Sequence, residues 1–267
     1  MFTFSIKKVL CFTFVVSLIS LFAVTPIADF EVDFTRDTAI EINGKEYRIA
    51  GDGFETLADG QKVMLFGRRN ALHVPVRDKI GTIGTLVWQF ALKPFQPFQG
   101  TPRRPMVTLN TNSRLKAGFS TGANVVPPFV QYSFGDGNLS LHHVQNNLEF
   151  NKLYTAAMSF DGSRVCCYLD GVLIHEGKQP IPLEANPWRD LFIGPVKDGW
   201  IDTGTWNEDT MGKRIQLFNR VLTAPEIAEL SGLQVVDISA RYPNILSVPG
   251  MRNPKADVQL DGNLQEP

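Results

Sequence analysis

The segment from Lys197 to Asp209, KDGWIDTGTWNED, brings together residue types that could bind a sugar. It holds two of the four tryptophans of the chain, with acidic and amide side chains between and beside them. An apolar ring face can stack on a sugar ring, and neighbouring polar groups can bind its hydroxyl groups. The candidate ligand-binding residues are Trp200, Asp202, Trp206 and Asn207. The alternative is that each tryptophan only packs against the edge of the fold.

The same segment carries acids that could hold a calcium ion. Calcium is bound by several oxygen atoms, usually carboxylates and carbonyl groups that converge from a loop. The candidate metal ligands are Asp198, Asp202, Glu208 and Asp209. Their spacing is not that of an EF-hand, so two hypotheses stay open: calcium as a cofactor, and a solvated polar loop with no cofactor.

The four histidines are the other residues with chemical potential. His142 and His143 are adjacent, and neighbouring residues of a strand point to opposite faces, so their rings would not act together. No serine, cysteine or acid lies at a spacing typical of a catalytic group. His73 and His175 are isolated in the sequence. We therefore expect ordinary strand side chains at these positions, with ligand binding by the adjacent pair as the alternative.

Composition limits the classes of partner. The chain has 26 basic and 27 acidic side chains and no basic cluster, which argues against a nucleic-acid partner. Its three cysteines, Cys11, Cys166 and Cys167, cannot form a disulfide scaffold, because the last two are neighbours on one expected strand. The fold must therefore be stabilised by its hydrophobic core.

The first 25 residues read as a targeting segment. Lys7 and Lys8 precede an apolar run from Val9 to Val24, as in a secretory signal peptide. The run is also about as long as a membrane span, so an uncleaved signal anchor is the alternative. We expect a secreted, cell-surface or periplasmic protein that meets a membrane only through this segment if it is retained.

The elements that must position these groups are mostly β-strands. In Tyr154–Glu176, YTAAMSFDGSRVCCYLDGVLIHE, three apolar runs are separated by Asp161-Gly162 and Asp170-Gly171. Asp-Gly between alternating runs is typical of hairpin turns, because glycine accepts a positive φ. The pattern predicts a three-stranded antiparallel meander in which alternate residues of the middle run face the core.

Further short strands are predicted along the rest of the chain. They include a first strand at Asp29–Phe34, a hairpin at Ala39–Ala50 and a very hydrophobic central strand at Gly84–Pro94. The only predicted helix follows Thr223, which with Glu226 forms a capping box, and it ends at Gly232. We predict an all-β fold: a two-sheet antiparallel β-sandwich, or jelly roll, with one short C-terminal helix.

Three blocks resemble the laminin-G-like, concanavalin A-like lectin/glucanase superfamily of secreted bacterial proteins. They are NALHVPVRDKIGTIGTLVWQFALKP, AAMSFDGSRVCCYLDGVLIHEG and RIQLFNRVLTAPEIAELSG, and they occur in the order of the family. The resemblance implies a jelly roll that binds ligands at a sheet face or at the loops along one edge. An isoleucine-aspartate-glutamate step of the family falls here on Gly212, Lys213 and Arg214, which puts any role of those acids in doubt.

The glucanase branch of this superfamily needs two carboxylates on one strand, in an E-x-D-x-E or E-x-D-x-x-E motif. Such spacing places the nucleophile and the general acid/base near one sugar ring. The only Glu-x-Asp of this chain is Glu31-Val32-Asp33, and it lacks the third acid. The sequence therefore disfavours a retaining glycosidase.

These observations lead to one main hypothesis and two alternatives. Residues 29–235 form a sandwich domain, and residues 236–267, polar and proline-rich, form a loosely attached tail. The domain is expected to be an exported, non-catalytic module that binds carbohydrate or another extracellular polymer. The alternatives are a glycoside hydrolase or lyase with an unrecognised acid pair, and a structural or partner-binding module of the cell surface.

Overall fold

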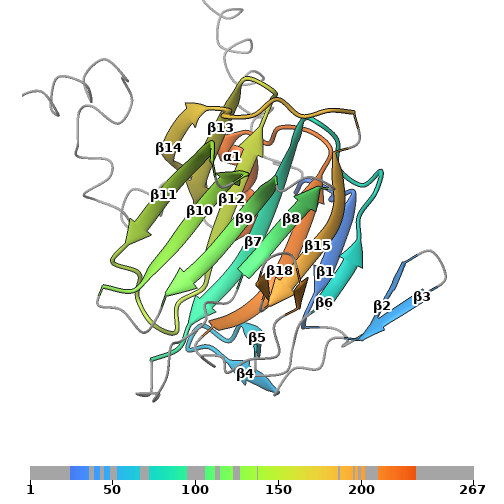
Figure 1. The fold of residues 1–267 in the computed structure, drawn as a ribbon. Coiled ribbons are helices and arrows are strands. Elements are labelled where there is room, and N and C mark those ends of the chain that lie inside the picture. Colours follow the sequence, from blue (N-terminus) through green and yellow to red (C-terminus); the bar gives the residue numbers. More distant parts are fainter. Residues whose placement is uncertain are drawn as a thin grey trace, which may run out of the picture.

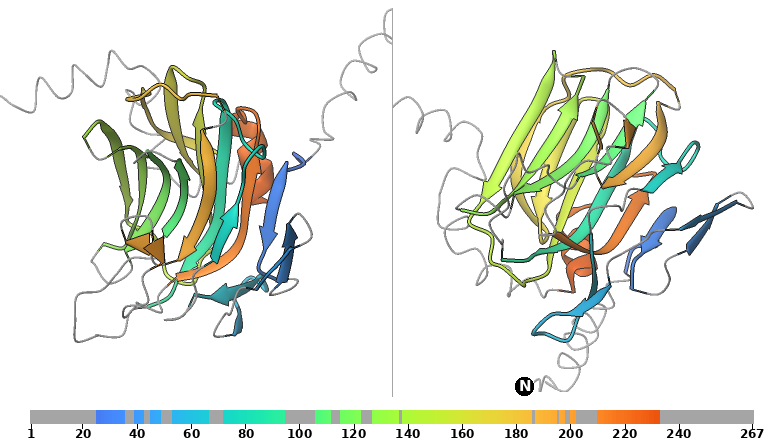
Figure 2. Two further views of the ribbon diagram at one scale, coloured as in Figure 1. Left: turned by 45° about the vertical axis from the view of Figure 1, so that its right-hand side comes forward. Right: turned by 60° about the horizontal axis from the view of Figure 1, so that its bottom comes forward.

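The computed structural model describes residues 25–35, 39–42, 45–48, 53–66, 72–94, 106–111, 115–122, 127–136, 138–185, 187–194, 196–197, 200–201 and 210–232. These residues form two antiparallel sheets packed face to face and one short helix (Figure 1). The two-sheet β-sandwich predicted from the sequence is confirmed. The left view of Figure 2 shows the sheets as two layers, with the helix outside one of them.

The larger sheet has eight strands. Its main path runs β14 (Val172–Lys178), β13 (Arg164–Leu169), β12 (Tyr154–Phe160), β7 (Gly84–Leu92), β18 (Thr210–Phe218), β5 (Lys62–Leu65) and β4 (Phe54–Thr56). The first strand of the described chain, β1 (Phe30–Asp33), also pairs with β18. All nine residues of β7 are buried, as the apolar run predicted for a central strand.

The smaller sheet has six strands. In spatial order they are β11 (Ser140–Asn146), β10 (Phe129–Gly135), β9 (Lys116–Gly122), β8 (Met106–Thr111), β15 (Trp188–Gly194) and β6 (Leu72–Pro75). Two short hairpins lie outside both sheets: β2 (Ala39–Ile42) with β3 (Lys45–Arg48), and β16 (Val196–Lys197) with β17 (Trp200–Ile201). The predicted hairpin at 39–50 is therefore present as the paired strands 39–42 and 45–48, and its other residues lie outside the described part of the chain.

Aromatic side chains fill the space between the sheets. The Trp88 ring stacks on Phe90 with ring centroids 4.7 Å apart and lies 6.2 Å from Phe119 of the other sheet. At another point Trp188 packs edge-on against Phe134, and its Nε1 donates a 2.9 Å hydrogen bond to the Gly81 carbonyl. Both tryptophans are fully buried, so the core, as predicted, is what holds the sandwich together.

The second turn of the meander joins the sheet to the helix. Asp170 and Gly171 both have positive φ, 51° and 82°. The Asp170 carboxylate accepts a 2.6 Å hydrogen bond from the Thr155 amide, and the Asp170 amide donates to the Thr155 carbonyl. A Cβ on Gly171 would lie 2.8 Å from backbone atoms of Ala228, so only glycine lets the helix approach this closely.

The helix α1 (Ala224–Ser231) forms where the sequence predicts it. Thr223 and Glu226 form the expected capping box, and Gly232 ends the helix in the left-handed conformation. Its buried residues pack on the outer face of the eight-stranded sheet, against Val87, Ala157 and Tyr168. Gln89 of β7 donates a 2.6 Å hydrogen bond to the carbonyl of Leu230, which ties the end of the helix to the central strand.

Cys166 and Cys167 are free thiols, as expected from their neighbouring positions on β13. Within the described residues, no helix combines the length and the apolar character needed to cross a membrane. Residues 1–24 of the predicted targeting segment lie outside the described residues, and so does the predicted tail at 236–267. The domain boundaries proposed from the sequence therefore stay predictions.

Candidate functional site

Most of the ligand-binding and metal-binding residues predicted from the sequence lie outside the described residues. For Trp200, which begins β17, only the backbone is described. The residues outside are Asp198, Asp202, Trp206, Asn207, Glu208 and Asp209. The predicted sugar site and calcium site in this segment therefore stay predictions, and the described residues point to a different surface.

That surface is the outer face of the six-stranded sheet. On β10, Val130, Tyr132 and Phe134 point into the core, so the alternate residues Gln131 and Ser133 point outward. The same alternation on each strand defines the face. Its residues are His73, Thr108, Asn110, Lys116, Ser120, Gln131, Ser133, His142, Val144, Asp190 and Phe192, and we call them the outer polar face.

The strand register places some of these residues in one straight row. Residues that pair across the sheet, in order from β11 to β6, are His142, Ser133, Gly118, Thr108, Phe192 and His73. Five steps between neighbouring strands make the row about 24 Å long. At its middle, a Cβ on Gly118 would lie 2.1 Å from the Val107 carbonyl oxygen. The row is therefore bare of a side chain at this point.

A histidine is held rigidly at the β6 end of the row. Nε2 of His73 donates a 2.8 Å hydrogen bond to Oδ1 of Asp190, and the imidazole stacks on the ring of Phe192 at 4.5 Å and 8°. Phe192 is buried, whereas the side chains of His73 and Asp190 are 47% and 30% exposed. The result is a fixed planar ring beside a carboxylate at the surface. His73, isolated in the sequence and on a strand as expected, thus finds its partners on the neighbouring strand.

The other end of the row carries a hydrogen-bonded chain of polar groups. Ser133 Oγ and His142 Nδ1 share a 3.0 Å hydrogen bond, and Nε2 of Gln131 donates to the same hydroxyl over 3.4 Å. A serine beside a histidine can serve as a nucleophile when a third group orients the ring. Within the described part of the chain no such contact to His142 is found. The hydroxyl, imidazole and amide groups at this end of the row are of the types that hydrogen-bond to hydroxyl groups.

Between the two ends lies a polar floor with an unsatisfied acceptor. Thr108 and Asn110 are only 6% and 8% exposed, and Oδ1 of Asn110 is buried with no hydrogen-bond partner. Asn110 pairs in register with Lys116 on one side and Asp190 on the other. A buried polar atom left unpaired costs about 1–3 kcal/mol. Oδ1 of Asn110 is thus an unsatisfied acceptor beneath the face, between Lys116 and Asp190 in register.

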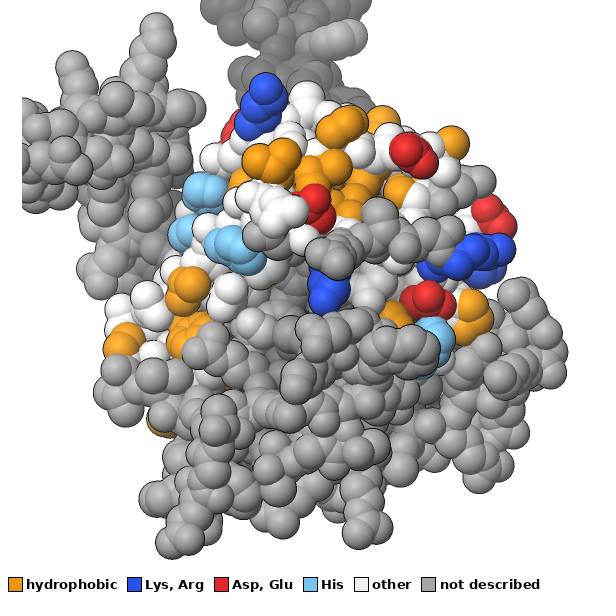
Figure 3. Space-filling model, viewed as in Figure 1, with side chains coloured by type: hydrophobic (Ala, Val, Ile, Leu, Met, Phe, Trp, Pro, Cys, Tyr) orange, Lys and Arg blue, Asp and Glu red, His pale blue; other side chains and the backbone are white. Residues whose placement is uncertain are grey.

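Figure 3 views the molecule from the side of this sheet. Histidine side chains, in pale blue, lie at both lateral edges of the face, over the β11 side and over the side of β6 and β15. Acidic and basic side chains occur together near the second edge. The described side chains of this face therefore show no single dominant charge.

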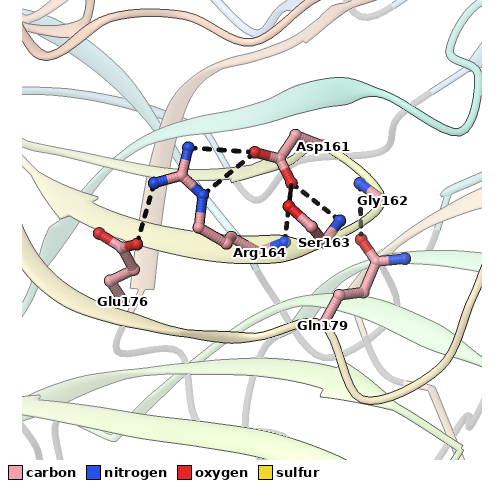
Figure 4. Close-up of polar contacts among 6 residues, drawn as sticks. All are labelled: Asp161, Gly162, Ser163, Arg164, Glu176 and Gln179. Carbon is pink, nitrogen blue, oxygen red and sulfur yellow. Dashed lines mark hydrogen bonds and ion pairs between the residues drawn. The ribbon is translucent and has the colours of Figure 1, made fainter.

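The first turn of the meander forms a separate polar cluster (Figure 4). One carboxylate oxygen of Asp161 accepts hydrogen bonds from the Ser163 hydroxyl and from the backbone amides of Ser163 and Arg164. These bonds, led by the one from the Ser163 hydroxyl, lower the pKa of Asp161 to about 2. Arg164 links Asp161 to Glu176 on the next strand. Every polar group here is used to shape a turn, so this cluster is scaffold.

Both acids of the Glu-x-Asp motif form ion pairs with an arginine of the neighbouring strand. Glu31 and Asp33 share one face of β1, and the guanidinium of Arg214 on β18 contacts both, at 3.5 Å from Glu31 and 3.1 Å from Asp33. Burial acts to raise the pKa of Asp33, but hydrogen bonds from Thr35 and the charge of Arg214 outweigh it and lower the pKa. Arg214, at one of the positions where the resembled family has acids, thus pairs with acids supplied by β1.

Two further histidines meet at the edge of the sandwich. His143 of β11 and His175 of β14 stack with ring centroids 4.8 Å apart and planes 10° apart. His142 and His143 do point to opposite faces, as predicted. His175, isolated in the sequence and on a strand as expected, has its ring partner on a strand of the other sheet.

Comparison with known proteins shows similarity of fold alone. No family model matches the chain, and no curated protein matches its sequence. Among solved structures, the botulinum neurotoxin type G receptor binding domain is similar, with a TM-score of 0.51, 14% identity and coverage of 78% of this chain and 51% of that one. The binding domain of botulinum neurotoxin serotype D is also similar, with a TM-score of 0.52, 8% identity and coverage of 76% of this chain and 50% of that one.

A sialidase of Trypanosoma rangeli, in complex with 2,3-difluorosialic acid, is also similar. Its TM-score is 0.55 at 16% identity, and the match covers 78% of this chain and 33% of that chain. This chain therefore spans about half the length of the neurotoxin domains and about a third of the sialidase. The chain has a β-sandwich fold similar to that of receptor-binding domains and of part of a sialidase.

Proposed function

We propose that this chain is an exported, non-catalytic module of the laminin-G-like, concanavalin A-like type that binds a carbohydrate or another extracellular polymer through the outer polar face. One observation carries the proposal. A straight row of polar side chains crosses the six-stranded sheet, ends at the fixed ring of His73, and runs beside the unpaired oxygen of Asn110.

The chemistry of the face suits a polyhydroxylated ligand. Amide, hydroxyl, imidazole and carboxylate groups offer both donors and acceptors within one row. The imidazole of His73 offers a flat surface for a sugar ring. Its hydrogen bond to Asp190 and its stacking on Phe192 orient the ring before binding, which reduces the entropic cost of ordering it when a ligand binds. The accessible side chains lie at the two ends of the row, His142 with Ser133 and His73 with Asp190, and a polymer about 24 Å long could contact both ends. Binding domains among the structural neighbours support the same class of function.

The proposal of a non-catalytic module rests on the carboxylates. Hydrolysis of a glycosidic bond by the common mechanism needs a pair of carboxyl groups, about 5–10 Å apart. Of the residues that define the outer polar face, only Asp190 carries a carboxylate. Glu31 and Asp33 lie on the other sheet and are paired with Arg214. Neither place supplies a free pair beside the row.

The tryptophan segment remains part of the proposal. Only one residue separates the end of β15 from the start of β16, so the chain enters this segment directly from the strand that carries Asp190 and Phe192. The candidate ligands Trp200, Asp202, Trp206 and Asn207 would then extend the same site, and calcium would be held by the acids of the segment.

A glycan array and polysaccharide pull-down with the full-length chain test the proposal, in calcium and in EDTA. We expect binding to at least one glycan class, lost in His73→Ala and in Asn110→Ala. The control is Lys178→Ala, an exposed residue of the other sheet, which should bind normally. No binding in either buffer, or equal binding by all variants, would overturn the proposal. Release of new reducing ends from a bound polysaccharide would overturn its non-catalytic part.

A further inference from the structure

The edge of the sandwich is closed by a contact between two histidines. β11 is an edge strand of the six-stranded sheet, and β14 is an edge strand of the eight-stranded sheet. His143 of β11 and His175 of β14 stack on each other between the two sheets. The contact continues at Gly177, where an added Cβ would lie 2.4 Å from Leu141 Cδ1. The two sheets thus meet side chain to side chain along this edge. We call the His143–His175 contact the edge pair.

The described side chains that face the edge pair carry no compensating charge. Tyr132 faces His143 from β10, with rings 6.2 Å apart, and Cys167 is the register partner of His175 on β13. Burial raises the pKa of Tyr132 and that of Cys167, so both stay neutral. Nε2 of His143 is buried without a hydrogen-bond partner.

The charged groups on the same strands point elsewhere. Glu176 is bonded to Arg164 on the opposite face of β14, and Lys178 lies on that face as well. His142 lies on the outer polar face, where it is bonded to Ser133. Among the described residues, no carboxylate contacts either ring of the edge pair.

Such an environment favours neutral imidazoles. Burial, together with the neighbouring His175, lowers the pKa of His143 to about 4, and burial lowers the pKa of His175. Both rings are therefore neutral near pH 7 and can stack. In acid, protonation of both rings would place two positive charges close together, because the ring centroids are 4.8 Å apart. No described carboxylate beside them would offset their repulsion. Separation of β11 from β14 would relieve this by exposing both rings to water.

We propose that the edge pair is an acid-sensitive contact whose protonation releases β11 from β14 and thereby weakens binding at the outer polar face. The link between the two is covalent: His142, which bonds to Ser133 at one end of the binding row, is the residue next to His143. The release of β11 follows from the edge pair itself, and its effect on binding rests on the function proposed above.

Hydrogen exchange of the full-length chain at pH 7.0 and pH 4.5, corrected for the intrinsic rate of exchange, tests the release. β11 is an edge strand that, among the described strands, pairs only with β10, so we expect it to separate from β10 more often once its contact with β14 is lost. The opening constant of β11 amides should then rise tenfold or more in acid, because each unit between the pKa values of the open and closed states is a factor of ten. Amides of β9 should not change. The double variant His143→Phe/His175→Phe keeps two stacked rings and should lose the effect. In His175→Gln only the ring of His143 can be protonated, so the opening constant of β11 amides should rise less in acid than in the wild type.

Equal protection of β11 in the wild-type chain at both pH values would overturn the proposal, as would an equal rise in the double Phe variant. Glycan affinity is then compared at the same two pH values. A loss of affinity in acid that the double Phe variant abolishes supports the regulatory role, whereas a loss that persists there assigns the effect to His142 or His73 and overturns it. Absence of any glycan binding at pH 7.0 refutes the proposed function alone, because hydrogen exchange still reports the edge.

Discussion

The imidazole of His73 lies parallel to the ring of Phe192 while its Nε2 donates to Oδ1 of Asp190, 2.8 Å away. Stacking fixes the plane of the ring, and the hydrogen bond fixes its rotation within that plane. The three residues lie on two neighbouring strands, so the sheet itself sets their distances. An exposed ring held in this way is prepared for a ligand before the ligand arrives.

Asp190→Asn should weaken glycan binding without unfolding the chain. The amide keeps the shape of the carboxylate but removes its charge, so His73 loses a charge-assisted hydrogen bond and its fixed orientation. We expect a loss of affinity of roughly tenfold, while the free energy of unfolding changes by less than about 1 kcal/mol, since the pair is exposed. Titration calorimetry and urea denaturation measure the two quantities. Unchanged affinity would show that the His73 ring does not contact the ligand.

Gly171→Ala should destabilise the chain much more than Gly162→Ala. Both glycines have a similar positive φ, 82° and 89°, so both substitutions carry the same backbone strain of about 1–2 kcal/mol. The added methyl group meets nothing at Gly162, but at Gly171 it would lie 2.8 Å from the backbone of α1 at Ala228. We expect an additional loss of about 1–3 kcal/mol at Gly171 from displacement of the helix.

Urea denaturation of both glycine variants measures the difference. Gly162→Ala serves as the matched control, because it reports strain without a clash. Equal losses of stability in the two variants would mean that α1 can shift at no cost, and that its contact with the meander does little to hold it.

Local features of this fold could be predicted from the sequence, whereas the contacts of the candidate site could not. The Asp-Gly turns and the Thr223–Glu226 capping box act over two to three residues, so a short segment is enough to reveal them. His73 and Asp190 are 117 residues apart, and they become neighbours only because β6 pairs with β15. His143 and His175 meet between two sheets, and no periodicity within one strand shows such a pair.

Thr85→Val should be costly although the two side chains have the same shape. The buried Thr85 hydroxyl donates to the Arg220 carbonyl and accepts from the Leu222 amide, so it fixes the turn between β18 and α1. Valine leaves both backbone groups unpaired, and we expect the free energy of unfolding to fall by roughly 1–3 kcal/mol. Thr56→Val on the exposed edge strand β4 is the control and should be nearly neutral. A similar small effect for both would show that water replaces the lost bonds.

Arg214→Gln should lower stability at neutral pH and flatten its dependence on pH in acid. The substitution leaves Glu31 and Asp33 without their cation, and we expect a loss of roughly 1–3 kcal/mol at pH 7. Since the folded-state pKa of Asp33 is lowered, its contribution is present above the unfolded pKa of about 3.8 and is lost as the pH falls through the lowered value. The difference in free energy of unfolding between wild type and variant should therefore shrink from pH 7 to pH 2.5. Urea denaturation at both pH values measures it, with Lys178→Gln as the exposed control. A difference that stays constant would indicate that Arg214 stabilises the sheet by packing of its alkyl chain.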